Sequence, residues 1–62
     1  MNDTEMMILS ALANGAKMDD YKHLNKELHN LHNHGYVHCY FDEQNHVIGG
    51  YITAVGKSII YK

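Results

Sequence analysis

Apolar residues recur at helical spacing in the first part of the chain. Ile8, Leu9 and Leu12 form a stripe along one side of a predicted helix. Asn2 followed by Glu5 three residues later is the pattern of a capping box, in which each residue satisfies a free backbone N–H of the other. The dipeptide Asn14-Gly15 then favours a stop, so the sequence predicts a helix between these two signals.

A second helical pattern covers residues 19–34. Acidic residues at its start favour the first turn of a helix, and Gly35 suits the left-handed conformation that ends one. Its apolar positions fall within one arc at about 100° per residue. These positions are Tyr21, Leu24, Leu28 and Leu31.

From Tyr36 onward the hydrophobic period changes to two, which predicts a strand. Val37, Cys39 and Phe41 are expected on its core face, and Tyr36, His38 and Tyr40 on the opposite face. The turn-forming run at 42–45 predicts a hairpin to a partner strand over 47–52. Gly49-Gly50 predicts a bulge in that strand or a close approach of another segment.

Two structures compete for the end of the chain. Thr53 can cap a helix over 54–61, with Ile59 and Ile60 returning to the core. The alternative is a pair of strands over 51–55 and 58–61 joined at Gly56-Lys57. The β-branched residues and Gly56 leave both structures open at this point.

The chain is short enough to predict a single domain over residues 1–62. A domain of this size buries only about 60% of the surface of its unfolded chain. Cys39 is the one cysteine, so no disulfide within the chain can compensate, and a homodimer is expected to supply further burial. The predicted core consists of Ile8, Leu9, Leu12, Tyr21, Leu24, Leu28, Leu31, Val37, Phe41, Ile52 and Ile59.

The apolar run at 6–13 resembles part of a secretory signal, but the residues before it argue against one. A signal peptide begins with basic residues, whereas Asp3 and Glu5 precede this run. No apolar run approaches the roughly 18 residues of a membrane span. We therefore expect a cytoplasmic protein without a membrane partner.

The charge balance is unusual for a protein that binds nucleic acid. Five lysines and no arginine stand against seven acidic residues, for a formal net charge of −2. Protonation of all six histidines would raise that charge to +4, and an ordinary histidine titrates near pH ~6.5. Any electrostatic function is thus expected to depend on pH.

Two segments carry a resemblance to a known superfamily. Residues 28–37 (LHNLHNHGYV) resemble the end of a winged helix recognition helix, with its leucine pair, glycine and strand start. Residues 52–56 (ITAVG) are similar to the closing motif, in which threonine caps the last helix. The order of these elements also resembles small prophage-encoded winged helix proteins of the YjcQ type. The resemblance implies an α+β winged helix fold of order α-α-β-β-α.

The resemblance has two departures. A helix-turn-helix places a short helix before its recognition helix, yet only residues 14–18 are free to connect the two predicted helices, so an abbreviated turn is expected. The predicted wing carries Asp42 and Glu43 where a phosphate-binding wing carries basic residues. We therefore do not expect the wing to lie against a DNA backbone.

The outward side of the 19–34 helix is the predicted DNA-binding site. It lacks carboxylates and carries lysines, which bind phosphate or guanine, and asparagines, which pair with adenine. The predicted contacts are Lys22, Asn25, Lys26, His29, Asn30 and Asn33. The resemblance implies a phage or prophage transcriptional regulator that binds double-stranded DNA in the major groove. The competing interpretation is an ordinary solvated helix face.

A second surface favours a different class of function. Aromatic residues with a polar tip are common at protein interfaces. The predicted partner interface consists of Tyr36, His38, Tyr40 and Tyr51. It suits a winged helix that binds a host protein, as a phage accessory or inhibitor protein would. Ordinary cross-strand pairing is the alternative explanation.

No residue pattern predicts catalysis, a cofactor or a metal. His29, His32, His34 and His38 lie near Cys39 in sequence, but their spacing matches no zinc motif. Cys39 is expected to be a small core residue, and no nucleophile and base occur in a catalytic order. The chain is therefore predicted not to be an enzyme.

Overall fold

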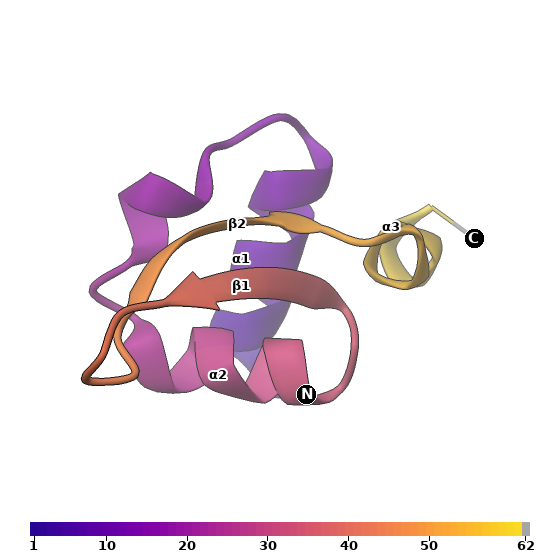
Figure 1. Ribbon diagram of the computed structural model, residues 1–62. Coiled ribbons are helices and arrows are strands. Elements are labelled where there is room, and N and C mark those ends of the chain that lie inside the picture. The colour runs from indigo at the N-terminus through magenta and orange to yellow at the C-terminus, as the bar shows by residue number, and fades with distance from the viewer. Residues whose placement is uncertain (62) are drawn as a thin grey trace.

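The computed structural model describes residues 1–61, which form the elements α1, η1, α2, β1, β2 and α3 in chain order (Figure 1). Helix α1 spans Asp3–Ala13. Its predicted capping box is present, since Glu5 N donates to Asn2 Oδ1 (2.7 Å) and Asn2 N donates to Glu5 Oε1 (3.0 Å). The helix ends at Asn14, and Gly15 follows at φ +99°, as the Asn-Gly signal predicts.

The predicted 19–34 helix is two elements, which corrects its start. A 3₁₀ helix, η1, covers Met18–Tyr21, and α2 covers Asn25–Asn33. Leu24 between them has a non-helical backbone (φ −94°, ψ 51°). With this break, both Met18 of η1, which is 3% exposed, and Leu28 of α2 are buried in the same core. The burial of Met18 and Leu28 in one core thus accompanies a break in the helix that the sequence pattern predicts as continuous. The end of α2 is as predicted, with Gly35 at φ +80°.

The hairpin pairs β1 (Val37–Phe41) with β2 (Val47–Ile52) in antiparallel register. Tyr40 pairs with Gly49 and Phe41 with Val47, so Ile48 is the extra residue of a bulge. The glycine signal is confirmed in a second way at Gly50. A Cβ added there would collide with the His38 carbonyl and lie 2.8 Å from Met18 Sδ, so only glycine fits.

Helix α3 spans Ala54–Ile60, and the competing two-strand arrangement is wrong. Thr53 decides between them, because its Oγ1 accepts from Gly56 N (3.1 Å) and donates to the Gly35 carbonyl (2.7 Å). Gly56 is buried against the Tyr36 backbone, where a Cβ would collide with the Tyr36 carbonyl. This close contact needs a residue without a side chain, which explains why a glycine occurs within α3.

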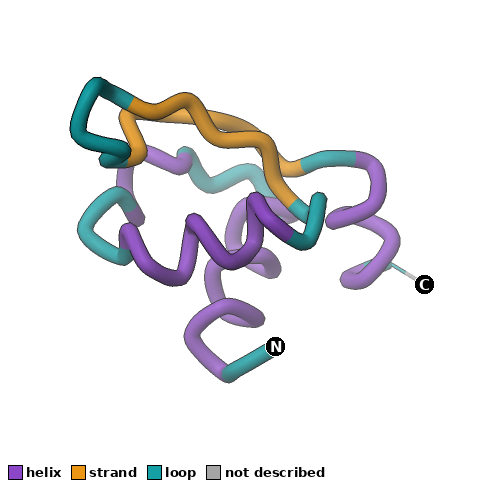
Figure 2. The backbone as a smooth tube through the Cα atoms, turned by 60° about the horizontal axis from the view of Figure 1, so that its bottom comes forward, coloured by secondary structure: helices purple, strands orange, loops and turns teal. Residues whose placement is uncertain are grey.

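Figures 1 and 2 show the hairpin lying across α1 and α2, with its tip at one end of the molecule and α3 at the other. The buried core lies between these layers and comprises Ile8, Leu9, Leu12, Met18, Leu28, Leu31, Val37, Cys39 and Val47. The other predicted core residues, Tyr21, Leu24, Phe41, Ile52 and Ile59, are partly buried and pack against it. Met18 and Val47 are the additions that the sequence pattern missed.

The structure is thus a small α+β fold with a two-stranded antiparallel sheet. Its helical order differs from the predicted one, because the start of the predicted 19–34 helix is a separate 3₁₀ helix, η1, between α1 and α2. None of the helices within residues 1–61 has the length and hydrophobicity needed to cross a membrane.

Candidate functional site

The outward side of α2 retains part of the predicted DNA-binding face. Lys26 and Asn33 are exposed, whereas Asn30 is half-buried and faces the start of α1. Lys22 is exposed but lies before α2, at the end of η1, and His23 follows it in the same exposed loop. The free polar side chains therefore lie on α2 and in the loop that leads into it.

The predicted face is not free of carboxylates. Lys22 Nζ lies 3.7 Å from Asp19 Oδ1, in an ion pair whose side chains are 44% and 64% exposed. The two residues stand three positions apart, a spacing at which side chains also meet on a continuous helix, so the sequence pattern could have shown this carboxylate beside Lys22. Exposed pairs of this kind contribute little stability, so Lys22 can exchange partners at small cost.

Two other predicted contacts point into the protein. Asn25 Oδ1 accepts from Val47 N (2.8 Å), and His29 Nε2 lies 2.6 Å from the Asn45 carbonyl oxygen. His29 also packs on Phe41, with 4.6 Å between ring centroids. The hydrogen-bonding groups of Asn25 and His29 are therefore engaged with the hairpin and are not free to contact a base.

A third side chain of α2 makes the same kind of contact. His32 Nδ1 accepts from Cys39 N (3.1 Å), and its ring packs edge-on to Phe41. Asn25, His29 and His32 stand at positions i, i+4 and i+7, so they share one side of the helix. We call these three residues the polar seam. Their spacing, next to the Leu28 and Leu31 stripe, is the sequence signal that would have placed them against the hairpin.

The hairpin tip is closed by its own acidic residue. Asp42 Oδ1 accepts from Gln44 N and His46 N, both at 2.9 Å. These backbone bonds, chiefly the one from His46, hold the pKa of Asp42 below its ordinary value. His46 also lies 3.8 Å from Asp42 Oδ2. The tip thus presents the Asp42 carboxylate within a folded turn, with Glu43 exposed beside it.

Three rings form a group on the outward face of the hairpin. His38 stacks on Tyr51 at 5.3 Å and meets Tyr40 edge-on at 5.1 Å between ring centroids. Tyr40 and Tyr51 are 52% and 53% exposed. Tyr36 does not belong to this group, because it is half-buried against the core and stacks on His34. The predicted partner interface is therefore reduced to His38, Tyr40 and Tyr51, which we call the aromatic face.

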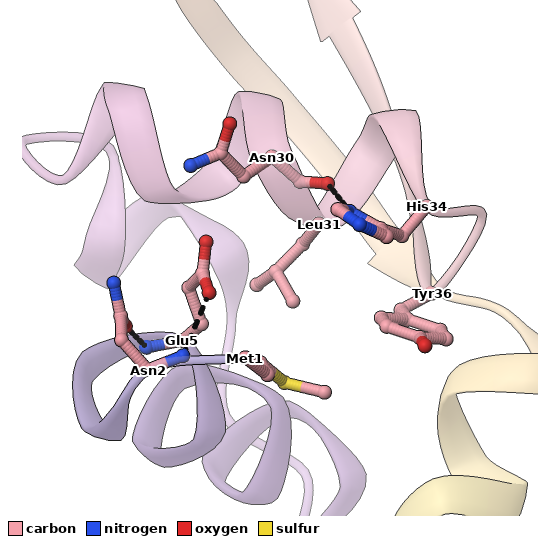
Figure 3. A pocket seen from close by; sticks show the side chains of 7 residues that line it. All are labelled: Met1, Asn2, Glu5, Asn30, Leu31, His34 and Tyr36. Atoms are coloured by element: carbon pink, nitrogen blue, oxygen red, sulfur yellow. Dashed lines mark hydrogen bonds between the residues drawn. The ribbon is translucent and has the colours of Figure 1, made fainter.

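A pocket of about 420 Å³ lies between the start of α1 and the end of α2 (Figure 3). Glu5 reaches into it from α1 and is only 7% exposed. The Asn2 backbone N–H holds the pKa of Glu5 below its ordinary value, with a smaller contribution from the Asn30 amide. His34 Nδ1 lies 2.7 Å from the Asn30 carbonyl oxygen, at the end of α2. The polar groups of this pocket thus already form hydrogen bonds at the start of α1 and the end of α2.

Cys39 is a core residue, as predicted. Burial raises the pKa of its thiol to about 11, and Sγ lies 3.8 Å from the Leu28 carbonyl oxygen. A protonated, buried thiol is unreactive. Among the described residues, no group of three or more His, Cys, Asp or Glu side chains could hold a metal ion.

Comparison of the chain with protein-family models, with curated proteins and with solved structures found no match. The resemblance to winged helix proteins therefore remains a prediction, and function has to be argued from the geometry of the chain itself.

Proposed function

We propose that this chain is a small winged helix protein that binds double-stranded DNA as a homodimer, with α2 as the recognition helix. The order α1, η1, α2, β1, β2, α3 carries the proposal. In this order η1 occupies the position of the short helix that precedes a recognition helix. Winged helix domains most often bind DNA, so the fold supports this function by analogy.

The free side chains of α2 favour the same function. The beginning of a recognition helix approaches the base edges in the major groove. Here Lys22 and His23 lie just before α2, and Lys26 lies in its first turn. Lysine binds phosphate or guanine, and the exposed Asn33 can pair with adenine.

The charge distribution limits the strength of such binding. Asp42 and Glu43 at the hairpin tip are exposed and would repel phosphate. The tip also lies close to α2, since Asn45 contacts His29. We therefore propose that α2 alone contacts DNA, with modest affinity in each protomer, and that a dimer contributes the second contact.

The test is a binding titration with a random-sequence DNA duplex at low salt. If Lys22 and Lys26 meet phosphate, log K falls with log salt concentration by roughly 0.9 for each phosphate neutralised. Lys22→Ala combined with Lys26→Ala should remove most of the binding. It should also reduce that slope by roughly 1.8 for each protomer in contact with DNA, because two phosphates are no longer neutralised in each.

Lys57→Ala is the matched control. Lys57 is exposed on α3, so this change also removes a lysine charge but leaves the α2 side of the molecule intact. A smaller effect of Lys57→Ala supports a specific site on α2. Absence of binding at tens of micromolar protein, or equal losses per charge in all variants, would exclude α2 as the DNA contact.

A second function has its own structural support. The aromatic face presents three packed rings to solvent on a hairpin whose tip is acidic, which suits a surface for another protein. Tyr40→Ala combined with Tyr51→Ala should then abolish capture of a host protein and leave DNA binding unchanged. Val55→Ala, at an exposed apolar residue of α3, is the control. Loss of DNA binding in the tyrosine variant would contradict this division of surfaces.

A further inference from the structure

The polar seam joins α2 to the hairpin through three hydrogen bonds between side chains and backbone. Its two histidines have opposite roles. A carbonyl oxygen only accepts, so His29 Nε2 must donate its N–H to Asn45 O. A backbone amide only donates, so His32 Nδ1 must accept from Cys39 N with its lone pair.

Protonation affects these two bonds differently. A doubly protonated imidazole still has an N–H at Nε2, so the bond from His29 to Asn45 survives in acid. The same change at His32 replaces the Nδ1 lone pair with an N–H that points at the N–H of Cys39. Acceptor and donor then become two donors 3.1 Å apart, and the bond cannot form.

We propose that the polar seam is a proton-sensitive latch, in which His32 holds the outer edge of β1 against α2 only while its imidazole is neutral. Acid would release β1 at Cys39 and loosen the hairpin from α2. The latch is a property of the fold and does not depend on DNA binding. It goes beyond the proposed function, because it predicts that acid weakens the contact between α2 and the hairpin.

An added charge on His32 would find no ion-pair partner in the described part of the chain. Within residues 1–61, no carboxylate lies within 4.0 Å of a His32 ring nitrogen, since the ion pairs in this part of the chain involve only Lys22 and His46. The Phe41 ring meets the His32 ring edge-on, with 5.0 Å between centroids, and the ring of His38, which belongs to β1, lies 5.6 Å from the His32 ring. A positive charge at His32 would therefore meet an apolar ring and a second histidine.

The other titratable groups around the latch would not oppose its opening. His29 lies about one turn earlier on α2, and a positive charge on its ring would repel one on His32. The Cys39 thiol has its pKa raised to about 11 by burial, so it stays neutral. Tyr51 stacks on His38, which in turn meets the His32 ring edge-on. Every charge gained in acid near the latch is positive.

The sign of the pH effect follows from the geometry. Only the neutral imidazole of His32 offers a lone pair to Cys39 N, so we expect the contact between the hairpin and α2 to be firmer at high pH than in acid. The lysine-based DNA contact is expected to respond in the opposite direction, because acid adds positive charge to the whole chain.

The direct experiment is an NMR titration of the full chain from about pH 8 to about pH 5.5, the range in which histidines titrate. At high pH the His32 ring nitrogens should report an unprotonated Nδ1. The Cys39 amide resonance should shift along the titration curve of His32. Amide exchange at Cys39, corrected for its intrinsic pH dependence, should lose roughly tenfold in protection, as removal of one ordinary hydrogen bond implies.

His32→Gln supplies the matched variant, because its side-chain oxygen can accept from Cys39 but cannot gain a proton. Its Cys39 amide should keep its protection across the titration. His23→Gln removes an exposed histidine outside α2 and should behave like the wild type. If His32→Gln does not fold, the wild-type titration decides alone. A Cys39 amide that ignores the titration of His32, or a His32 ring protonated at Nδ1 at high pH, would overturn the proposal.

Discussion

Replacement of Asn25 tests the reassignment of this residue from DNA contact to structural tie. Asn25→Ala removes the acceptor of the Val47 N–H, and Val47 is only 4% exposed, so water does not readily replace the missing acceptor. An unsatisfied buried donor costs about 1 to 3 kcal/mol. Alanine has a higher helix propensity than asparagine, by roughly 0.5 kcal/mol, which offsets part of that cost. We expect a net loss of about 1 to 2 kcal/mol in the free energy of unfolding.

The assay is urea unfolding followed by circular dichroism, with Asn33→Ala as the matched control. Asn33 is the same residue type on the same helix, but it is exposed, so its replacement should change stability by no more than about 0.5 kcal/mol. Asn25→Asp keeps an acceptor for Val47 and places a negative charge at the start of α2, where it is favourable. It should therefore restore most of the stability. Equal stabilities of Asn25→Ala and Asn33→Ala would refute the structural role of Asn25.

Two further predictions concern the core and the assembly. Leu28 is fully buried, so Leu28→Ala should cost about 2 to 5 kcal/mol and unfold much of a domain whose total stability is on the order of 3 to 9 kcal/mol. Thermal melts that show a decrease below about 1 kcal/mol would contradict the placement of this residue. The chain should also self-associate at micromolar concentration, and sedimentation equilibrium should report twice the chain mass. A monomer whose melting temperature does not change with concentration would remove the case for a dimer.

The polar seam and the proposed DNA contact make opposite demands on pH. Acid adds positive charge to the chain and favours its approach to DNA, yet it removes the bond by which His32 holds β1 against α2. If both proposals hold, binding should rise with falling pH and then decline as the hairpin loosens. A His32→Gln chain should lack the decline, which separates failure of the latch from failure of DNA binding.

Local chemistry was sufficient to predict the ends of most elements. The Asn2 and Glu5 capping box, the Thr53 cap on Gly56 and the left-handed Gly35 each involve residues no more than a few positions apart. The alternation of β1 likewise depends only on the geometry of a strand. Such interactions form wherever the chain adopts the local structure, so the sequence alone specifies them.

Tertiary contacts decided the rest. Met18, which the sequence pattern assigned to a connector, is buried in a core built from distant segments, and η1 begins at this residue. Asn25 and His29 appeared to belong to a solvated face, since their partners Val47 and Asn45 lie 22 and 16 positions further along the chain. A polar side chain on a helix has the same pattern in the sequence whether it faces water or a backbone amide. Only the path of the hairpin across α2 distinguishes the two, and that path depends on how the whole core packs.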